Sequence, residues 1–154
     1  MKKNVYTIVA LIVVLSSIGL AQEGGGRLNG TWDAEIKITN CETGARITSF
    51  QSTANFHKGG TFTGITSGMP PASRTPEVGV WRHETGNSYK FRFKAYLFNA
   101  AGAPVAYQII SHTLQLADDA TTYESSGSSR IFGMDGVQTG SACSSGIGTR
   151  MVLD

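Results

Sequence analysis

The chain of 154 residues is poor in the residue types that carry metal, redox or covalent chemistry. Its three histidines, His57, His83 and His112, have no local spacing of the H-x-H or H-x-x-x-H kind, so no metal site is expected. The two cysteines, Cys41 and Cys143, do not form a C-x-x-C motif, which argues against a redox centre. A Gly-x-Ser-x-Gly motif is also absent, and we expect no cofactor and no catalytic nucleophile.

The chain also lacks a marked excess of either positive or negative charge, with 13 basic and 11 acidic residues. Lys2 and Lys3 precede an apolar run, which ends in Gly19 and Ala21 at the −3 and −1 positions of a cleavage site. This pattern is typical of a secretory signal peptide over residues 1–21. Without its two lysines, the chain has 11 basic and 11 acidic residues and is formally neutral. Such a balance does not favour nucleic acid or an acidic membrane surface as a partner.

An uncleaved membrane anchor is the alternative to a signal peptide. The apolar stretch 5–15 is shorter than the roughly 20 residues that a spanning helix needs, so cleavage is favoured, with no membrane contact afterwards. We therefore expect a secreted or periplasmic protein, with residues 22–29 as a flexible lead-in to a domain over 30–154. Because exported proteins meet an oxidising environment, a Cys41–Cys143 disulfide is expected rather than two buried thiols.

No segment of the exported part has helical periodicity, but alternation with a period of two recurs along it. In the stretch TWDAEIKI, Trp32, Ala34 and Ile36 share one face, while charged residues occupy the other. Proline is confined to four positions, and three of them interrupt the pattern within 68–76, which we expect to be the longest loop. The pattern predicts eight strands, over 31–38, 46–57, 61–67, 77–84, 88–98, 105–116, 121–132 and 137–153.

Short turns between these strands favour antiparallel neighbours in a meander, which must expose two edges or close on itself. If Cys41 faces Cys143 across an antiparallel pair of the first and last strands, Ala34 faces Arg150 and shares its face with Trp32. One register then satisfies both the disulfide and a Trp–Arg neighbourhood. The sequence therefore predicts an all-β fold, an eight-stranded antiparallel up-and-down β-barrel closed by pairing of the first and last strands, rather than an open sandwich.

Gly30-Thr31-Trp32 at the start of the first strand and Arg150 near the end of the last resemble the calycin superfamily, the lipocalin-like up-and-down β-barrels. In that family a basic residue of the last strand packs over the tryptophan of Gly-x-Trp. The resemblance implies that Trp32 and Arg150 are structural and plug one end of the barrel. The segments NCETG and FHKGGTFT also resemble a group of small exported bacterial proteins, which implies export and a barrel but no activity.

The residues that face the barrel interior decide whether it can hold a ligand. Small residues of the last strand (Gly140, Ala142, Gly146 and Gly148) oppose bulky aromatic residues, which leaves open either a cavity or tight packing. Our leading hypothesis is a module that binds a small hydrophobic or amphipathic ligand by burial, at the end near Cys41 and away from Trp32. The expected ligand-binding residues are Phe50, Phe56, Tyr89, Phe91, Phe93, Tyr107 and Ser111.

Two other classes of function remain open. One is an enzyme of the allene oxide cyclase-like barrel kind, which needs an inward carboxylate or tyrosine, for which Glu124 or Tyr123 could serve. The other is a packed structural or interaction barrel without a ligand. Lys90 and Arg92 alternate with aromatic residues, but the pleat sends the two sets to opposite faces, which argues against single-stranded nucleic acid. Nothing in the sequence sets an oligomeric state.

Overall fold

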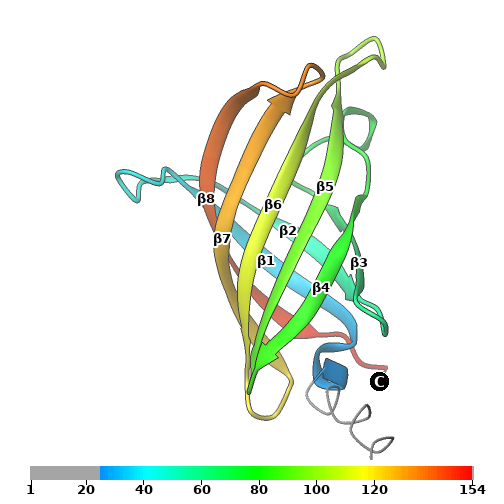
Figure 1. Cartoon of the computed structure of the whole chain (residues 1–154), viewed down its shortest axis with the longest axis vertical. Coiled ribbons are helices and arrows are strands. Elements are labelled where there is room, and N and C mark those ends of the chain that lie inside the picture. Colours follow the sequence, from blue (N-terminus) through cyan, green and yellow to red (C-terminus); the bar gives the residue numbers. More distant parts are fainter. Residues whose placement is uncertain (1–24, 154) are drawn as a thin grey trace, which may run out of the picture.

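The computed structural model describes residues 25–153, which form a closed barrel of eight antiparallel strands (Figure 1). Each strand pairs with its neighbours in chain order, and β8 pairs back onto β1. The predicted all-β, up-and-down, eight-stranded barrel is therefore confirmed. The strands are β1 (Gly30–Thr39), β2 (Arg46–Phe56), β3 (Thr61–Thr66), β4 (Glu77–Thr85), β5 (Ser88–Phe98), β6 (Pro104–Leu116), β7 (Thr122–Gly133) and β8 (Gln138–Arg150).

Seven of the predicted strands agree with the structure to within one residue at each end, whereas β8 ends at Arg150 rather than at residue 153. Two short 3-10 helices complete the described part, η2 (Gly25–Leu28) before β1 and η3 (Pro71–Ser73) in the long proline-containing loop. The expected signal peptide, 1–21, and the first part of the lead-in lie outside the described residues. Within residues 25–153, no helix is long and apolar enough to cross a membrane.

The register of β1 against β8 differs from the predicted one by two residues. Arg150 lies opposite Trp32 and not Ala34, and Cys143 lies opposite Thr39. The prediction was wrong because the disulfide does not join directly opposed strand residues: Cys41 lies beyond the end of β1, with its Cα 5.0 Å from that of Cys143. A shift by two residues keeps every side chain on its expected face, so the predicted Trp–Arg neighbourhood survives.

Trp32 fills one end of the barrel, which we call the closed end. Its side chain is fully buried, and its indole N–H donates to the carbonyl of Leu28 in η2 at 3.0 Å. The guanidinium of Arg150 lies 4.2 Å from the centre of the indole ring, which is the expected cation–π contact. Figure 1 shows η2 and the C-terminal end of the chain together at this end of the barrel.

Arg150 also joins three separate segments at the closed end. It donates hydrogen bonds to the backbone carbonyls of Ala120 at 2.8 Å, of Asn29 at 2.6 Å and of Arg27. Gly30 makes room for this side chain, since a Cβ at that position would lie 2.8 Å from Nη1 of Arg150. With its φ of 134°, Gly30 also adopts a backbone conformation that other residues disfavour. The glycine of the Gly-x-Trp motif thus has a steric reason in this chain.

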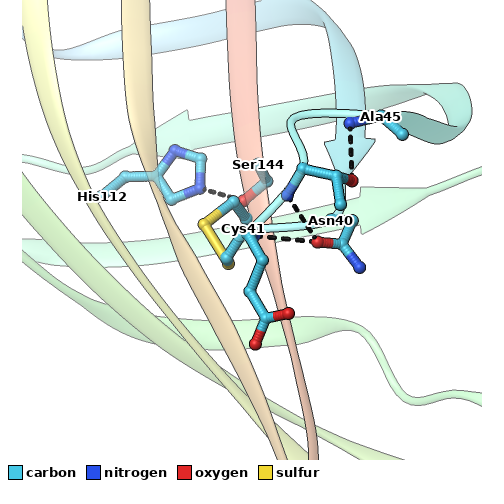
Figure 2. The surroundings of a disulfide bond; sticks show 8 residues. Asn40, Cys41, Ala45, His112 and Ser144 are labelled. Carbon is cyan, nitrogen blue, oxygen red and sulfur yellow. Dashed lines mark hydrogen bonds between the residues drawn. A yellow bond between two sulfur atoms is a disulfide. The ribbon is translucent and has the colours of Figure 1, made fainter.

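The predicted disulfide between Cys41 and Cys143 is present and holds the turn between β1 and β2 against β8 (Figure 2). The same turn is ordered by Asn40, whose side-chain oxygen accepts hydrogen bonds from the backbone N–H groups of Glu42 and Thr43 at 2.8 and 3.0 Å. The covalent link therefore fastens the barrel at the end opposite Trp32.

Replacing both cysteines by alanine is expected to reduce the free energy of unfolding by about 4–5 kcal/mol, because the bridge closes a loop of about 100 residues in the unfolded chain. Urea unfolding of the oxidised protein and of the double variant measures the difference. The wild-type protein treated with a reductant should match the variant. Equal stability of all three would contradict a structural disulfide.

Replacing Arg150 by methionine is expected to cost about 2–3 kcal/mol of unfolding free energy, since three carbonyls lose their donor and Trp32 loses its cation. Arg92→Met on the exposed face of β5 is the matched control, with an expected change below about 0.5 kcal/mol. Urea unfolding followed by tryptophan fluorescence compares the two variants. A control as unstable as Arg150→Met would show that loss of any arginine has this effect.

Candidate functional site

A cavity of about 310 Å³ occupies the part of the barrel interior away from Trp32. It reaches the surface beside Ile47 and Met69, whose side chains are exposed and belong to the barrel end that carries the β1–β2 turn and the β3–β4 loop. Cys41 lies in that turn, so the cavity lies at the end where a ligand is expected from the sequence. Most of the lining is apolar and includes Ile36, Ile38, Phe50, Phe62, Phe91, Phe93 and Ile110.

The space exists because two neighbouring strands present small side chains to the interior. Residues of β7 and β8, such as Ser129 and Ala142, line the cavity, and Gly146 and Gly148 continue the inward face of β8, as expected. The ring of Tyr123 lies where a Cβ of Gly148 would be only 2.2 Å away. Tyr123 in turn packs edge-on against Trp32, with ring centres 5.1 Å apart. Tyr123 thus separates the cavity from the plug.

Three of the expected ligand-binding residues line the cavity, namely Phe50, Phe91 and Phe93. Two others are buried below it. Phe56 packs edge-on against Phe91 at 5.4 Å between ring centres, and Tyr89 packs near Trp81 at the closed end. Phe56 and Tyr89 therefore belong to the aromatic core that supports the cavity and do not line it.

Tyr107 and Ser111 face away from the interior, so their predicted inward orientation is wrong. Tyr107 stacks on Phe132 with ring centres 5.1 Å apart, and Nζ of Lys94 lies 4.0 Å from its ring on the outer surface. Ser111 lies opposite Arg92, which is exposed. Both faces of β6 carry apolar residues, so alternation alone does not select the inner one. The inward set is Gln108, Ile110, His112, Leu114 and Leu116.

A buried ion pair forms the main polar feature of the cavity wall. Nη1 of Arg74 donates to Oε1 of Glu77 at 2.8 Å, and both side chains are more than nine-tenths buried. Nη2 of Arg74 donates to Oε1 of Gln108 at 3.3 Å, and Nε2 of Gln108 donates to Oγ of Ser129 at 2.6 Å. This polar chain, Glu77–Arg74–Gln108–Ser129, links the start of β4 to β6 and β7 across the interior.

Two oxygen atoms beside this chain remain available to a ligand. Among the described residues, Oε2 of Glu77 and the hydroxyl of Tyr123 have no hydrogen-bond partner, and both residues line the cavity. Burial raises the pKa of Glu77, and the neighbouring Arg74 guanidinium offsets part of that rise. Burial also raises the pKa of Tyr123, and the charge of Glu77 adds to the effect. The tyrosine is therefore a neutral hydrogen-bond donor.

His112 forms a second polar cluster on the cavity wall. Its Nδ1 is 3.1 Å from Oγ of Ser125, and its Nε2 is 2.6 Å from Oγ of Ser144. Figure 2 shows the ring pointing toward Ser144, which follows the disulfide residue Cys143 on β8. Burial lowers the pKa of His112 to about 4, so the imidazole is neutral near neutral pH. One ring nitrogen then donates and the other accepts.

The structure does not bring the three histidines together. His57 contacts Oγ1 of Thr63 at 2.8 Å, and His83 contacts the carbonyl of Gly86 at 2.7 Å, both outside the cavity. Within residues 25–153, no group of three or more His, Cys, Asp or Glu side chains could hold a metal ion.

The carboxylate and tyrosine considered for an enzyme are divided between the two faces of β7. Tyr123 lines the cavity, whereas Glu124 points outward and is exposed. The inward carboxylate is instead Glu77, which the sequence analysis missed. The sequence does carry a signal for this orientation. Glu77, Gly79 and Trp81 are two residues apart on one strand and therefore share a face, and Trp81 is buried.

No protein-family model, curated protein or solved structure matches the chain. The closed antiparallel barrel is compatible with a calycin-like fold, and the disulfide fits an oxidising extracellular or periplasmic environment. The cavity and its polar groups therefore carry the functional interpretation.

His112 makes stability depend on pH. Its pKa is about 4 in the fold, below the 6.5 of a histidine in the unfolded chain, so the unfolded chain takes up a proton that the folded one does not as the pH falls through this range. Relative to His112→Gln, the wild type should lose about 2–3 kcal/mol of unfolding free energy between about pH 7 and about pH 4.5. Urea unfolding at both pH values measures this difference. His57→Gln on the surface is the control, and the idea fails if both variants respond alike.

Proposed function

We propose that the protein is an exported binding module of calycin-like architecture that encloses a small apolar or amphipathic molecule. The observation that carries this proposal is the cavity of about 310 Å³, closed at one end by Trp32 and open at the other. Ligand sites are mostly apolar concavities with a few convergent polar groups, and this cavity has that composition. Export is supported by the disulfide and by the signal-like first segment.

Burial of apolar surface would supply most of the affinity in this proposal. Phe91 and Phe93 stack with Phe62 at ring-centre distances of 5.4 and 5.1 Å, which gives one side of the cavity a continuous aromatic wall. Each Å² of apolar ligand surface removed from water contributes about 25 cal/mol. The opposite wall has small hydroxyl and methyl side chains, which leave the volume that the ligand occupies.

Ala142→Phe should block binding, because the new ring would project into the cavity from β8. Ile147→Phe places the same ring on the exposed outer face of the same strand and is the matched control. Fluorescence of the neutral apolar probe N-phenyl-1-naphthylamine reports binding. We expect enhanced fluorescence with wild type and control, and a loss of at least tenfold in affinity with Ala142→Phe. Equal binding by the two variants would place the probe outside the cavity.

Native mass spectrometry of the protein purified from its own source tests the proposal directly. A co-purified small molecule that is lost on Ala142→Phe is the expected result. A protein that carries no added mass and does not bind the probe would leave the cavity without a ligand role.

A second candidate is an enzyme that isomerises or cyclises a reactive apolar substrate in the same cavity. The observation that favours it is Glu77, a buried carboxylate of raised pKa that lines the cavity together with Tyr123. A carboxylate of this kind can act as a general base where water is excluded. Release of a molecule chemically different from the one that bound, and its loss on Glu77→Gln, would favour the enzyme over the binding module.

A further inference from the structure

We propose that the Arg74–Glu77 pair makes the cavity selective for an uncharged amphipathic ligand, whose polar head is a hydroxyl or carboxamide group, over a carboxylate of the same chain length. This inference rests on the proposed function, because it specifies the ligand of the same cavity. It is carried by the charge balance of the cavity and by the two oxygen atoms that face it.

The charge balance follows from the residues that line the cavity. In the described part of the chain, Arg74 and Glu77 are the only arginine, lysine, aspartate or glutamate residues that line the cavity, and they form an ion pair at 2.8 Å. A neutral ligand preserves this balance. A carboxylate would add an unpaired negative charge beside Glu77, and an ammonium group an unpaired positive one beside Arg74. Burial of an unpaired charge is strongly unfavourable.

The hydrogen-bonding groups narrow the ligand further. Oε2 of Glu77 can only accept, whereas the hydroxyl of Tyr123 can donate. Oε2 would lie 2.7 Å from a Cβ on Gly64, so the bare backbone of β3 leaves room for the carboxylate. A hydroxyl or carboxamide group offers both the donor that Glu77 requires and an acceptor for Tyr123. An ether or ester can only accept, and a carboxylate meets a second carboxylate with no proton between them.

The same reasoning identifies Glu77 as the residue that sets the preference. In Glu77→Gln, Arg74 keeps its positive charge but loses its counter-ion inside the barrel. A ligand carboxylate would then restore the balance in place of Glu77. The variant is therefore expected to invert the selectivity, which loss of packing or of a single hydrogen bond would not do.

Displacement of N-phenyl-1-naphthylamine by decanol, decanamide and decanoate tests the inference. The wild type should bind decanol and decanamide at least tenfold more tightly than decanoate near neutral pH. Its apparent affinity for decanoate should rise by up to tenfold per unit as the pH falls, because binding takes up one proton, while that for decanol stays constant. Glu77→Gln should bind decanoate at least tenfold more tightly than the wild type, without this pH dependence.

Glu124→Gln is the matched control, since it removes the same charge from the outer face of β7 and should retain the wild-type preference. Equal, pH-independent affinities of the wild type for decanol and decanoate would overturn the inference while leaving the proposed function intact. Failure of decanol, decanamide and decanoate all to bind would overturn both the inference and the proposed function. If Glu77→Gln does not fold, the pH dependence of the wild type still decides the matter.

Discussion

The contact between Arg150 and Trp32 is the interaction on which the rest of the structure depends. Arg150 comes from the last strand, Trp32 from the first, and the guanidinium also holds backbone carbonyls of the lead-in and of the β6–β7 turn. These contacts close one end of the barrel and fix the register of β1 against β8 there. Because that end is filled, the cavity occupies the other part of the interior and opens beside Ile47 and Met69, at the end that carries the disulfide.

The polar groups of the interior are arranged to satisfy each other and to leave little unpaired. The polar chain from Glu77 to Ser129 and the His112 cluster each connect several strands through hydrogen bonds of 2.6–3.3 Å. Buried polar groups without partners are costly, so networks of this kind also favour one strand register over others. The cavity is thus an apolar space whose wall carries a neutralised ion pair and a neutral histidine.

The sequence predicts the barrel well because its alternation and turn signals are local. The run TWDAEIKI places Trp32 on the correct face, and the small residues of β8 face inward as expected. The site is predicted only in part. On β6 both faces carry apolar residues, so the choice of Tyr107 over Gln108 has no local basis, and only pairing with the aromatic face of β5 decides it.

Contacts between residues that are far apart in the sequence also cannot be predicted from local sequence patterns. In the sequence, Arg74 lies in an expected loop and Glu77 at the start of an expected strand, where charged residues are usually exposed. Only the closed barrel places this pair next to Gln108 and away from water. The two-residue error in the β1–β8 register has the same origin. A disulfide restrains two Cα atoms to a short distance, but it does not require them to be opposed in a ladder.

Closure by β1 and β8 has a consequence for how the chain reaches its native state. The strands that must meet lie at opposite ends of the described chain, and their link spans 102 positions. A barrel of this topology has no edge only when the last strand has arrived; until then β1 and β7 both present unpaired N–H and C=O groups. Contacts between such distant residues form slowly. The barrel is therefore complete only when the final strand has paired with both β7 and β1.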